Sequence, residues 1–186
     1  FTMSMFWLWL TLTIMEDGVP EWLTFDYSIS MKWKVRVGLL SIGAFVSIFS
    51  GTFVSTTPGA NFGCGVDGLP NSWPLCNGKI IDSVEDVVAQ SQIIHRWFVG
   101  LMLIALIFAS YSISNEQTEN NVLRNWIWGS TFLFFVNTSI GAIYVLSWDM
   151  EEGFFEFLSL VHLMMASLTF VTMAISWIGC SIAEDG

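Results

Sequence analysis

Four long stretches without a charged residue are the feature that most constrains how this chain can fold. They cover residues 37–56, 97–115, 125–148 and 157–183, and each is at least 19 residues long. About 20 apolar residues in an α-helix are enough to cross the hydrocarbon core of a bilayer. Because an isolated strand could not satisfy its backbone hydrogen bonds in lipid, each stretch is expected to be a helix. The sequence therefore predicts an all-α fold, a polytopic transmembrane four-helix bundle.

The composition agrees with a lipid environment. Apolar residues make up 54% of the 186 residues and charged residues only 12%, whereas about a quarter of a typical soluble domain is charged. A chain of this length suits one bundle. The net charge of −10 at pH 7 disfavours nucleic acid as a partner. The partner expected from composition is membrane lipid.

The expected organisation is a bundle over residues 37–183, with a long loop over 57–90, preceded by a segment over 1–36. The start of that segment, Phe1–Met15, is uncharged and apolar but too short to cross a bilayer alone. It is interpreted either as the end of a longer helix or as an interfacial helix, for which its tryptophans are suited. No basic region with a small-residue cleavage site marks it as a signal peptide. The remainder is expected to be a cytoplasmic linker.

The basic residues predict an orientation. Cytoplasmic flanks of membrane helices are enriched in Lys and Arg. Four of the six basic residues flank the first and third stretches: Lys32, Lys34, Arg36 and Arg124. These flanks are expected to face the cytoplasm, so that the loops over 57–90 and 149–156 face outward.

Two of the three cysteines, Cys64 and Cys76, lie in the first outward loop. A disulfide persists outside the cytoplasm, and this one would close a short Gly- and Pro-rich loop. The alternative is a pair of unpaired thiols. Their spacing excludes a redox or zinc motif with two intervening residues, and Cys180 in the last stretch is interpreted as a packing residue.

The only two histidines each lie near the start of an apolar stretch, His95 before the second and His162 within the fourth. Both stretches run inward, so the imidazoles are expected at similar depth in the outer half of the membrane. An imidazole in a bilayer is costly unless the bundle interior uses it. Two at matching depth on helices packed about 8–10 Å apart suit the axial positions of a buried heme iron.

Two other interpretations of the histidines stay open. One is a hydrogen bond between helices, with no metal involved. The other is a copper site, because copper accepts imidazole and thioether ligands. The methionines considered for such a site are Met102, Met150, Met164 and Met165.

Several motifs resemble the heme A synthase family. The run Trp73-Pro74-Leu75-Cys76-Asn77-Gly78, followed by His95-Arg96 at the start of the next stretch, is the more specific part. Asn137-Thr138-Ser139-Ile140-Gly141 and Val161-His162 are similar to the rest of the pattern. The resemblance covers roughly residues 37–180. It corresponds to one four-helix half of the eight-helix family members, like the short archaeal forms.

This resemblance implies a b-type heme bound through His95 and His162, with Arg96 either clamping a heme propionate or reaching to the headgroups. It also implies conversion of heme O to heme A, an oxidation of a ring methyl group to a formyl group. The Cys64–Cys76 pair would be a disulfide associated with electron supply. A homo-oligomer, or a subunit of a membrane complex in a prokaryotic plasma membrane, is the expected assembly.

Gln92 is a departure from the family, whose active half has Glu one helical turn before the ligand. An amide hydrogen-bonds but cannot carry charge or relay a proton as a carboxylate does, so a catalytic role of Gln92 is the weak point. Glu85, Asp86 and Glu156 are other acids near the outer surface, where a solvated face also explains them. The alternative function is a non-catalytic heme-binding or structural subunit of a respiratory or oxygenase complex.

Overall fold

Four long α-helices form the fold in the computed structural model, which describes residues 31–80, 87–116, 121–148, 153 and 155–182. The described residues contain no strand, and a short 3-10 turn, η2, follows the first helix. The all-α prediction is therefore confirmed. Of the segment expected over residues 1–36, residues 1–30 lie outside the described part, and residues 31–36 belong to the first described helix. The helices are α2 (Met31–Thr56), α3 (Val87–Asn115), α4 (Asn121–Leu146) and α5 (Glu156–Ile182), and η2 covers Ala60–Phe62.

Each helix is long and apolar enough to cross a membrane. All four begin before the corresponding charge-free stretches, α2 and α3 by the largest margins. The first helix starts at Met31 instead of 37, and α3 starts at Val87 instead of 97. The expected loop is correspondingly shorter, because its last four residues belong to α3. His95 thus lies in the third turn of its helix.

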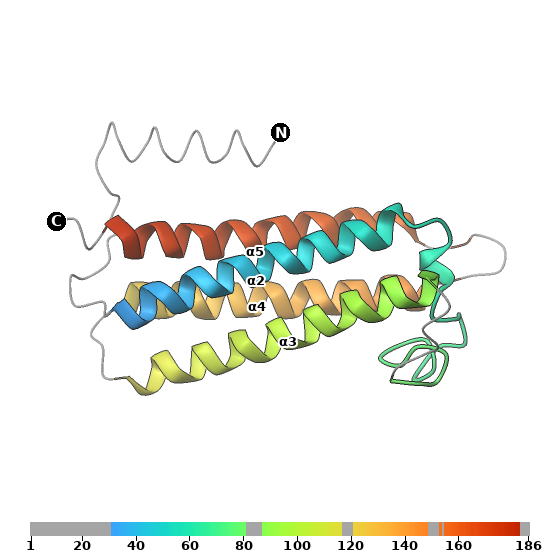
Figure 1. The fold of residues 1–186 in the computed structure, drawn as a ribbon, viewed down its shortest axis with the longest axis horizontal. Helices are drawn as coiled ribbons and strands as arrows, with labels where there is room; N and C mark the ends of the chain where they lie inside the picture. The colour runs from blue at the N-terminus through green and yellow to red at the C-terminus, as the bar shows by residue number, and fades with distance from the viewer. Residues whose placement is uncertain (1–30, 81–86, 117–120, 149–152, 154, 183–186) are drawn as a thin grey trace.

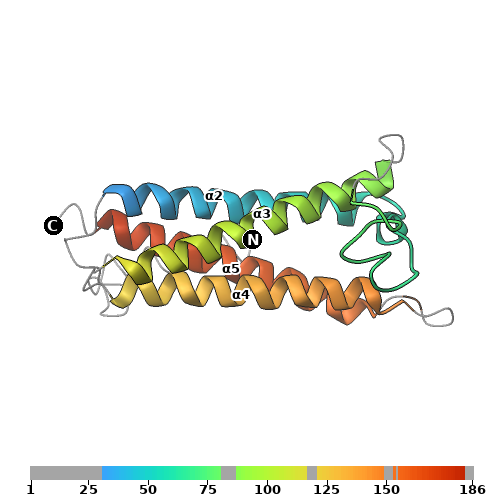
Figure 2. The same ribbon diagram turned by 90° about the horizontal axis from the view of Figure 1, so that it is seen from below.

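The helices run side by side along the long axis of the molecule (Figures 1 and 2), and each packs mainly against two others. Helix α2 packs against α3 and α5, and α4 also packs against α3 and α5. In this cyclic order α3 and α5 lie diagonally across the bundle. Side chains from these two helices can therefore meet at its centre.

Apolar side chains cover the outside of the bundle as well as filling its core. Large apolar side chains face outward, with Phe49, Ile104 and Phe132 each about two-thirds exposed (66%, 66% and 65%). Hydroxyl groups are buried between helices, where Ser110 and Thr131 share a hydrogen bond of 2.8 Å. Hydroxyl pairs and close contacts hold helices together where lipid removes the hydrophobic drive for association. The outward faces suit acyl chains.

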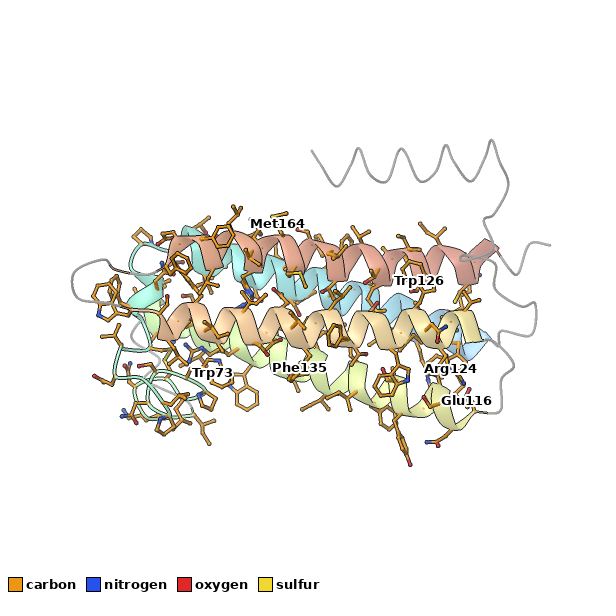
Figure 3. All side chains as sticks on the ribbon, turned by 180° about the vertical axis from the view of Figure 1, so that it is seen from behind. Trp73, Glu116, Arg124, Trp126, Phe135 and Met164 are labelled. Carbon is orange, nitrogen blue, oxygen red and sulfur yellow. A yellow bond between two sulfur atoms is a disulfide. The ribbon has the colours of Figure 1, made fainter. Side chains whose placement is uncertain are left out.

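One end of the bundle, which we call the Glu116 end, is closed by an ionic cluster (Figure 3). Glu116, just after α3, accepts hydrogen bonds from Lys32 and from the indole of the buried Trp33, and Arg36 lies 3.6 Å away. Partial desolvation opposes ionisation, but the Lys32 and Trp33 hydrogen bonds and the charges of Lys32 and Arg36 outweigh it. The pKa of Glu116 is therefore below its ordinary value.

The other end, which we call the disulfide end, carries the loop over residues 57–80. The predicted disulfide is confirmed: Cys64 and Cys76 are bonded, and both are buried against Ala89 of α3. Gly63 packs on the backbone of Val88, where an added Cβ would lie 2.6 Å from the carbonyl oxygen. Only glycine permits so close an approach, so the loop is seated on the first turns of α3.

Candidate functional site

The two histidines meet inside the bundle, as their matched depth predicts. The ring centres of His95 on α3 and His162 on α5 are 6.4 Å apart, with an angle of 85° between the ring planes. Both side chains are half-buried. The diagonal placement of their helices brings one imidazole in from each side of the bundle.

The protonated nitrogen of His162 follows from its hydrogen bond. Nδ1 lies 3.0 Å from the backbone oxygen of Asn137 on α4. A carbonyl oxygen only accepts, so Nδ1 must carry the proton and donate. In a neutral ring this leaves the lone pair on Nε2, the form in which histidine binds a metal.

His95 reaches the same state by a different contact. Its Nδ1 lies 2.9 Å from Oγ of Ser50 on α2, and that hydroxyl already donates its single proton to the backbone oxygen of Ser47 at 2.8 Å. The Ser50 oxygen therefore accepts, and Nδ1 of His95 donates. Both rings thus present an unprotonated Nε2, and each is oriented by a neighbouring helix as metal-binding histidines usually are.

A glycine lies against each imidazole. A Cβ at Gly51 of α2 would lie 3.2 Å from Cε1 of His95, and a Cβ at Gly141 of α4 would lie 2.8 Å from Cε1 of His162. The missing side chains give each ring room against its neighbouring helix. The α2–α3 and α4–α5 pairs therefore repeat one arrangement, a histidine held by a hydrogen bond and packed on a glycine.

The spacing of the rings fits two ligands of one metal ion. Metal–imidazole bonds are about 2.0–2.1 Å, and the bonding nitrogen is roughly 1.1 Å from the ring centre, so collinear ligands have ring centres about 6.3 Å apart. The observed 6.4 Å agrees, and the ring planes need only share the axis through the metal. No group of three His, Cys, Asp or Glu side chains gathers among the described residues, so the described part of the chain offers these two imidazoles alone as such ligands.

Met102 and Met164, two of the four methionines considered for copper, lie away from the histidine pair. The sulfur of Met102 packs on Gly43, seven residues or about 10 Å along α3 from His95. Met164 is 64% exposed and points away from the bundle (Figure 3). Met150 lies outside the described residues. The other alternative, hydrogen bonding between helices, is present through Nδ1 of both rings and leaves each Nε2 available.

The side chain of Gln92 makes a structural hydrogen bond. Its side chain is only 5% exposed, and Nε2 donates to the backbone oxygen of Ala60 at 3.0 Å. The amide thereby ties η2 to α3. A carboxylate could not make this bond unless it were protonated, because it has no hydrogen to donate.

Arg96 binds the disulfide loop. Its Nη1 donates to the backbone oxygens of Ser72 and Leu75, at 2.9 and 2.7 Å. Its Nη2 is buried and has no hydrogen-bond partner in the described residues. The guanidinium therefore anchors the loop through one nitrogen, a contact that was not among the two roles expected for Arg96.

Sequence patterns did not identify the groups that orient the two rings. Ser50 and Gly51 resemble ordinary packing residues of a membrane helix, and the Asn137 contact is made by a backbone atom. The sequence shows a glycine in the helix that precedes each histidine-bearing helix, Gly51 before His95 and Gly141 before His162. This was the one pattern that could have indicated the packing of the two rings. Of the acids considered as substitutes for a glutamate at position 92, Glu156 lies at the disulfide end, whereas Glu85 and Asp86 are outside the described residues.

Comparisons with protein-family models, with curated proteins and with solved structures found no match. The candidate site therefore stands on its geometry: two imidazoles with ring centres 6.4 Å apart inside a membrane bundle, whose Nδ1 atoms are hydrogen-bonded and whose Nε2 atoms have no hydrogen bond among the described residues.

Proposed function

We propose that this chain binds one b-type heme between His95 and His162. The observation that carries the proposal is the 6.4 Å separation of two imidazoles whose Nδ1 atoms are both occupied by hydrogen bonds. His95 and His162 would hold the heme, which would supply redox chemistry at its iron. The buried Nη2 of Arg96, one residue from His95, is suited to a propionate.

The activity that we propose is that of a heme A synthase-like membrane oxidoreductase, which converts heme O to heme A. The resemblance of the Trp73–Gly78 run and of His95-Arg96 supports it, and so does the Cys64–Cys76 disulfide beside the site. In this proposal His95 and His162 hold the heme, and Arg96 couples the disulfide loop to α3.

A second candidate is a non-catalytic heme-binding subunit of a larger respiratory or oxygenase complex. The observation that favours it is Gln92, whose amide is committed to the Ala60 carbonyl. No carboxylate takes its place one turn before the histidine. Two histidine ligands on one iron also leave no open position, a coordination suited to electron transfer.

The proposed location is the plasma membrane of a prokaryote, with the disulfide end outward. Lys32, Lys34, Arg36 and Arg124 all lie at the Glu116 end, and Figure 3 shows Arg124 there. This asymmetry supports a cytoplasmic Glu116 end. A homo-oligomer is part of the proposal, since one chain corresponds to a single half of the larger family members.

The test is a pyridine hemochrome spectrum, with mass analysis of the extracted heme, of protein purified from cells that make heme O. His95→Ala and His162→Ala are compared with Met164→Ala, a control on the same helix that faces away from the site. We expect heme in the wild type and in Met164→Ala, and its loss in both histidine variants. Absence of heme from the wild type, or its retention in both histidine variants, would overturn heme binding at this pair.

The identity of the heme separates the two candidates. Heme A accumulating with the wild type, and not with the histidine variants, supports the synthase. Heme B alone, with no conversion of heme O, supports the non-catalytic subunit.

A further inference from the structure

A polar pocket of about 270 Å³ lies at the disulfide end, where α2 and α4 end and α5 begins. Its lining includes Ser55, Asn61, Tyr144, Glu156 and Ser159. The volume is just below the range of about 300–1,000 Å³ typical of drug-sized ligands. It is suited to one substituted ring.

The pocket lies directly above the histidine pair along three helices. On α5, Glu156, Ser159 and His162 follow one another at intervals of three residues, which places them on one face. On α4, Tyr144 lies one turn beyond Gly141, the residue that packs on His162. On α2, Ser55 lies one turn beyond the glycine that packs on His95. A ligand in the pocket would therefore be about a turn from the two rings.

Hydrogen bonds in the pocket run toward Glu156. Asn61 Nδ2 donates to the hydroxyl of Tyr144 at 3.1 Å. This hydroxyl in turn donates to the Glu156 carboxylate through long contacts of 3.4 and 3.5 Å. A carboxylate has about four acceptor positions, and Tyr144 is its one hydrogen-bond donor among the described residues. Because Glu156 is exposed, its remaining acceptor positions are open to water or to a ligand that donates a hydrogen bond.

Exposed aromatic side chains adjoin the lining residues in the sequence: Phe53 and Phe157 are 50% and 60% exposed. They lie at the ends of membrane-length helices, where aromatic side chains meet the headgroup region. A ligand that combines a hydroxylated ring with an apolar tail matches both the polar lining of the pocket and the lipid-facing surface of these helices.

We propose that this pocket binds the head group of a membrane hydroquinone, with one ring hydroxyl donating to Glu156. The proposal extends the proposed function by naming a class of lipid-soluble molecule that reaches the histidine pair. Binding of the hydroquinone does not itself require heme, so the two proposals fail separately.

The test is isothermal titration of the protein, as purified in detergent, with a decyl-substituted benzohydroquinone kept reduced. Glu156→Gln removes the charged acceptor, and Tyr144→Phe removes the hydroxyl but keeps the ring. Asp67→Asn is the matched control, an exposed carboxylate in the disulfide loop outside the pocket. We expect saturable binding to the wild type and to Asp67→Asn. Glu156→Gln should weaken it about tenfold or more, since hydrogen bonds to charged groups are the strong ones, and Tyr144→Phe severalfold.

A second ligand tests the same hydrogen bond without changing the protein. The dimethyl ether of the hydroquinone has the same ring and tail but cannot donate, so it should bind the wild type about tenfold more weakly. The proposal is overturned if the ether binds as well as the hydroquinone. It is also overturned if Glu156→Gln matches Asp67→Asn, or if uptake by the wild type does not exceed partition into empty micelles.

Discussion

Replacing Gly141 with alanine tests how the ring of His162 is positioned. The new Cβ would lie 2.8 Å from Cε1 of His162, where ordinary van der Waals contact begins at 3.4 Å. The ring must therefore retreat by up to 0.6 Å. Directed along the hydrogen bond from Nδ1 to the Asn137 oxygen, this shift would lengthen it from 3.0 to 3.6 Å, beyond the range of a hydrogen bond.

The expected loss of stability comes from two effects and is partly offset by a third. Overpacking in a close-packed interior costs about 1–3 kcal/mol. Losing the His162 hydrogen bond costs about 0.5–1.5 kcal/mol more. Alanine is better than glycine in a helix by about 0.8–1.0 kcal/mol. Gly141→Ala should therefore be destabilised by about 0.5–3.5 kcal/mol.

The assay is unfolding in detergent followed by tryptophan fluorescence, with heme binding measured in parallel. Gly129→Ala is the control on the same helix, because a Cβ there meets nothing within 4 Å. It should be as stable as the wild type or slightly more so. Gly51→Ala, with a milder contact of 3.2 Å to His95, should fall between the two. Equal stability and heme binding in Gly141→Ala and Gly129→Ala would refute the described packing of His162.

Three further changes give distinct outcomes. Ser50→Ala removes the acceptor for His95 Nδ1 and should lower heme affinity about tenfold or more, measured by heme titration; an unchanged affinity would show that this contact does not orient the ring. Glu116→Gln should lower stability by about 1 kcal/mol at pH 7. Because the folded-state pKa of Glu116 is lowered, this difference should disappear as the pH falls through that pKa, and a difference independent of pH in unfolding experiments would contradict it. Gln92→Glu replaces a donor facing the Ala60 oxygen and should destabilise the protein by about 1–3 kcal/mol; stability equal to the wild type's would indicate a protonated carboxyl group.

The fold was predictable because charge-free stretches of membrane length admit few structures. The bounds of the helices were less predictable, because a charge-free stretch marks only the part of a helix that lies in the hydrocarbon layer, and the helix continues beyond it. At α2, Lys32 and Arg36 continue the helix because Glu116 pairs with them. At α3, the added turns contain Gln92 and Arg96, whose side chains donate hydrogen bonds to carbonyl oxygens of η2 and of the disulfide loop.

The similar depth of the two histidines was predictable because the position of a residue along a membrane helix determines its depth. The groups that accept hydrogen bonds from the two rings could not be predicted. The Ser50 contact depends on how α2 and α3 pack, and the Asn137 contact uses a backbone oxygen that every residue has. Gln92 was considered for chemistry, yet its partner, the Ala60 oxygen, lies 32 positions away in the chain. Such contacts appear only when the chain is folded.

The repeated arrangement of the two helix pairs has a consequence for assembly. The α2–α3 hairpin carries His95 with its hydroxyl support, and the α4–α5 hairpin carries His162 with its carbonyl support. Each hairpin therefore builds its own half of the pair, and the pair exists only when the hairpins associate. A ligand that bridges the rings would favour the associated form, by about 2.7 kcal/mol at a free concentration one hundred times its Kd. The bound ligand would then hold the two hairpins together. If the chain is divided at residues 117–120 and the two fragments are co-expressed, they should co-purify only when this ligand is present.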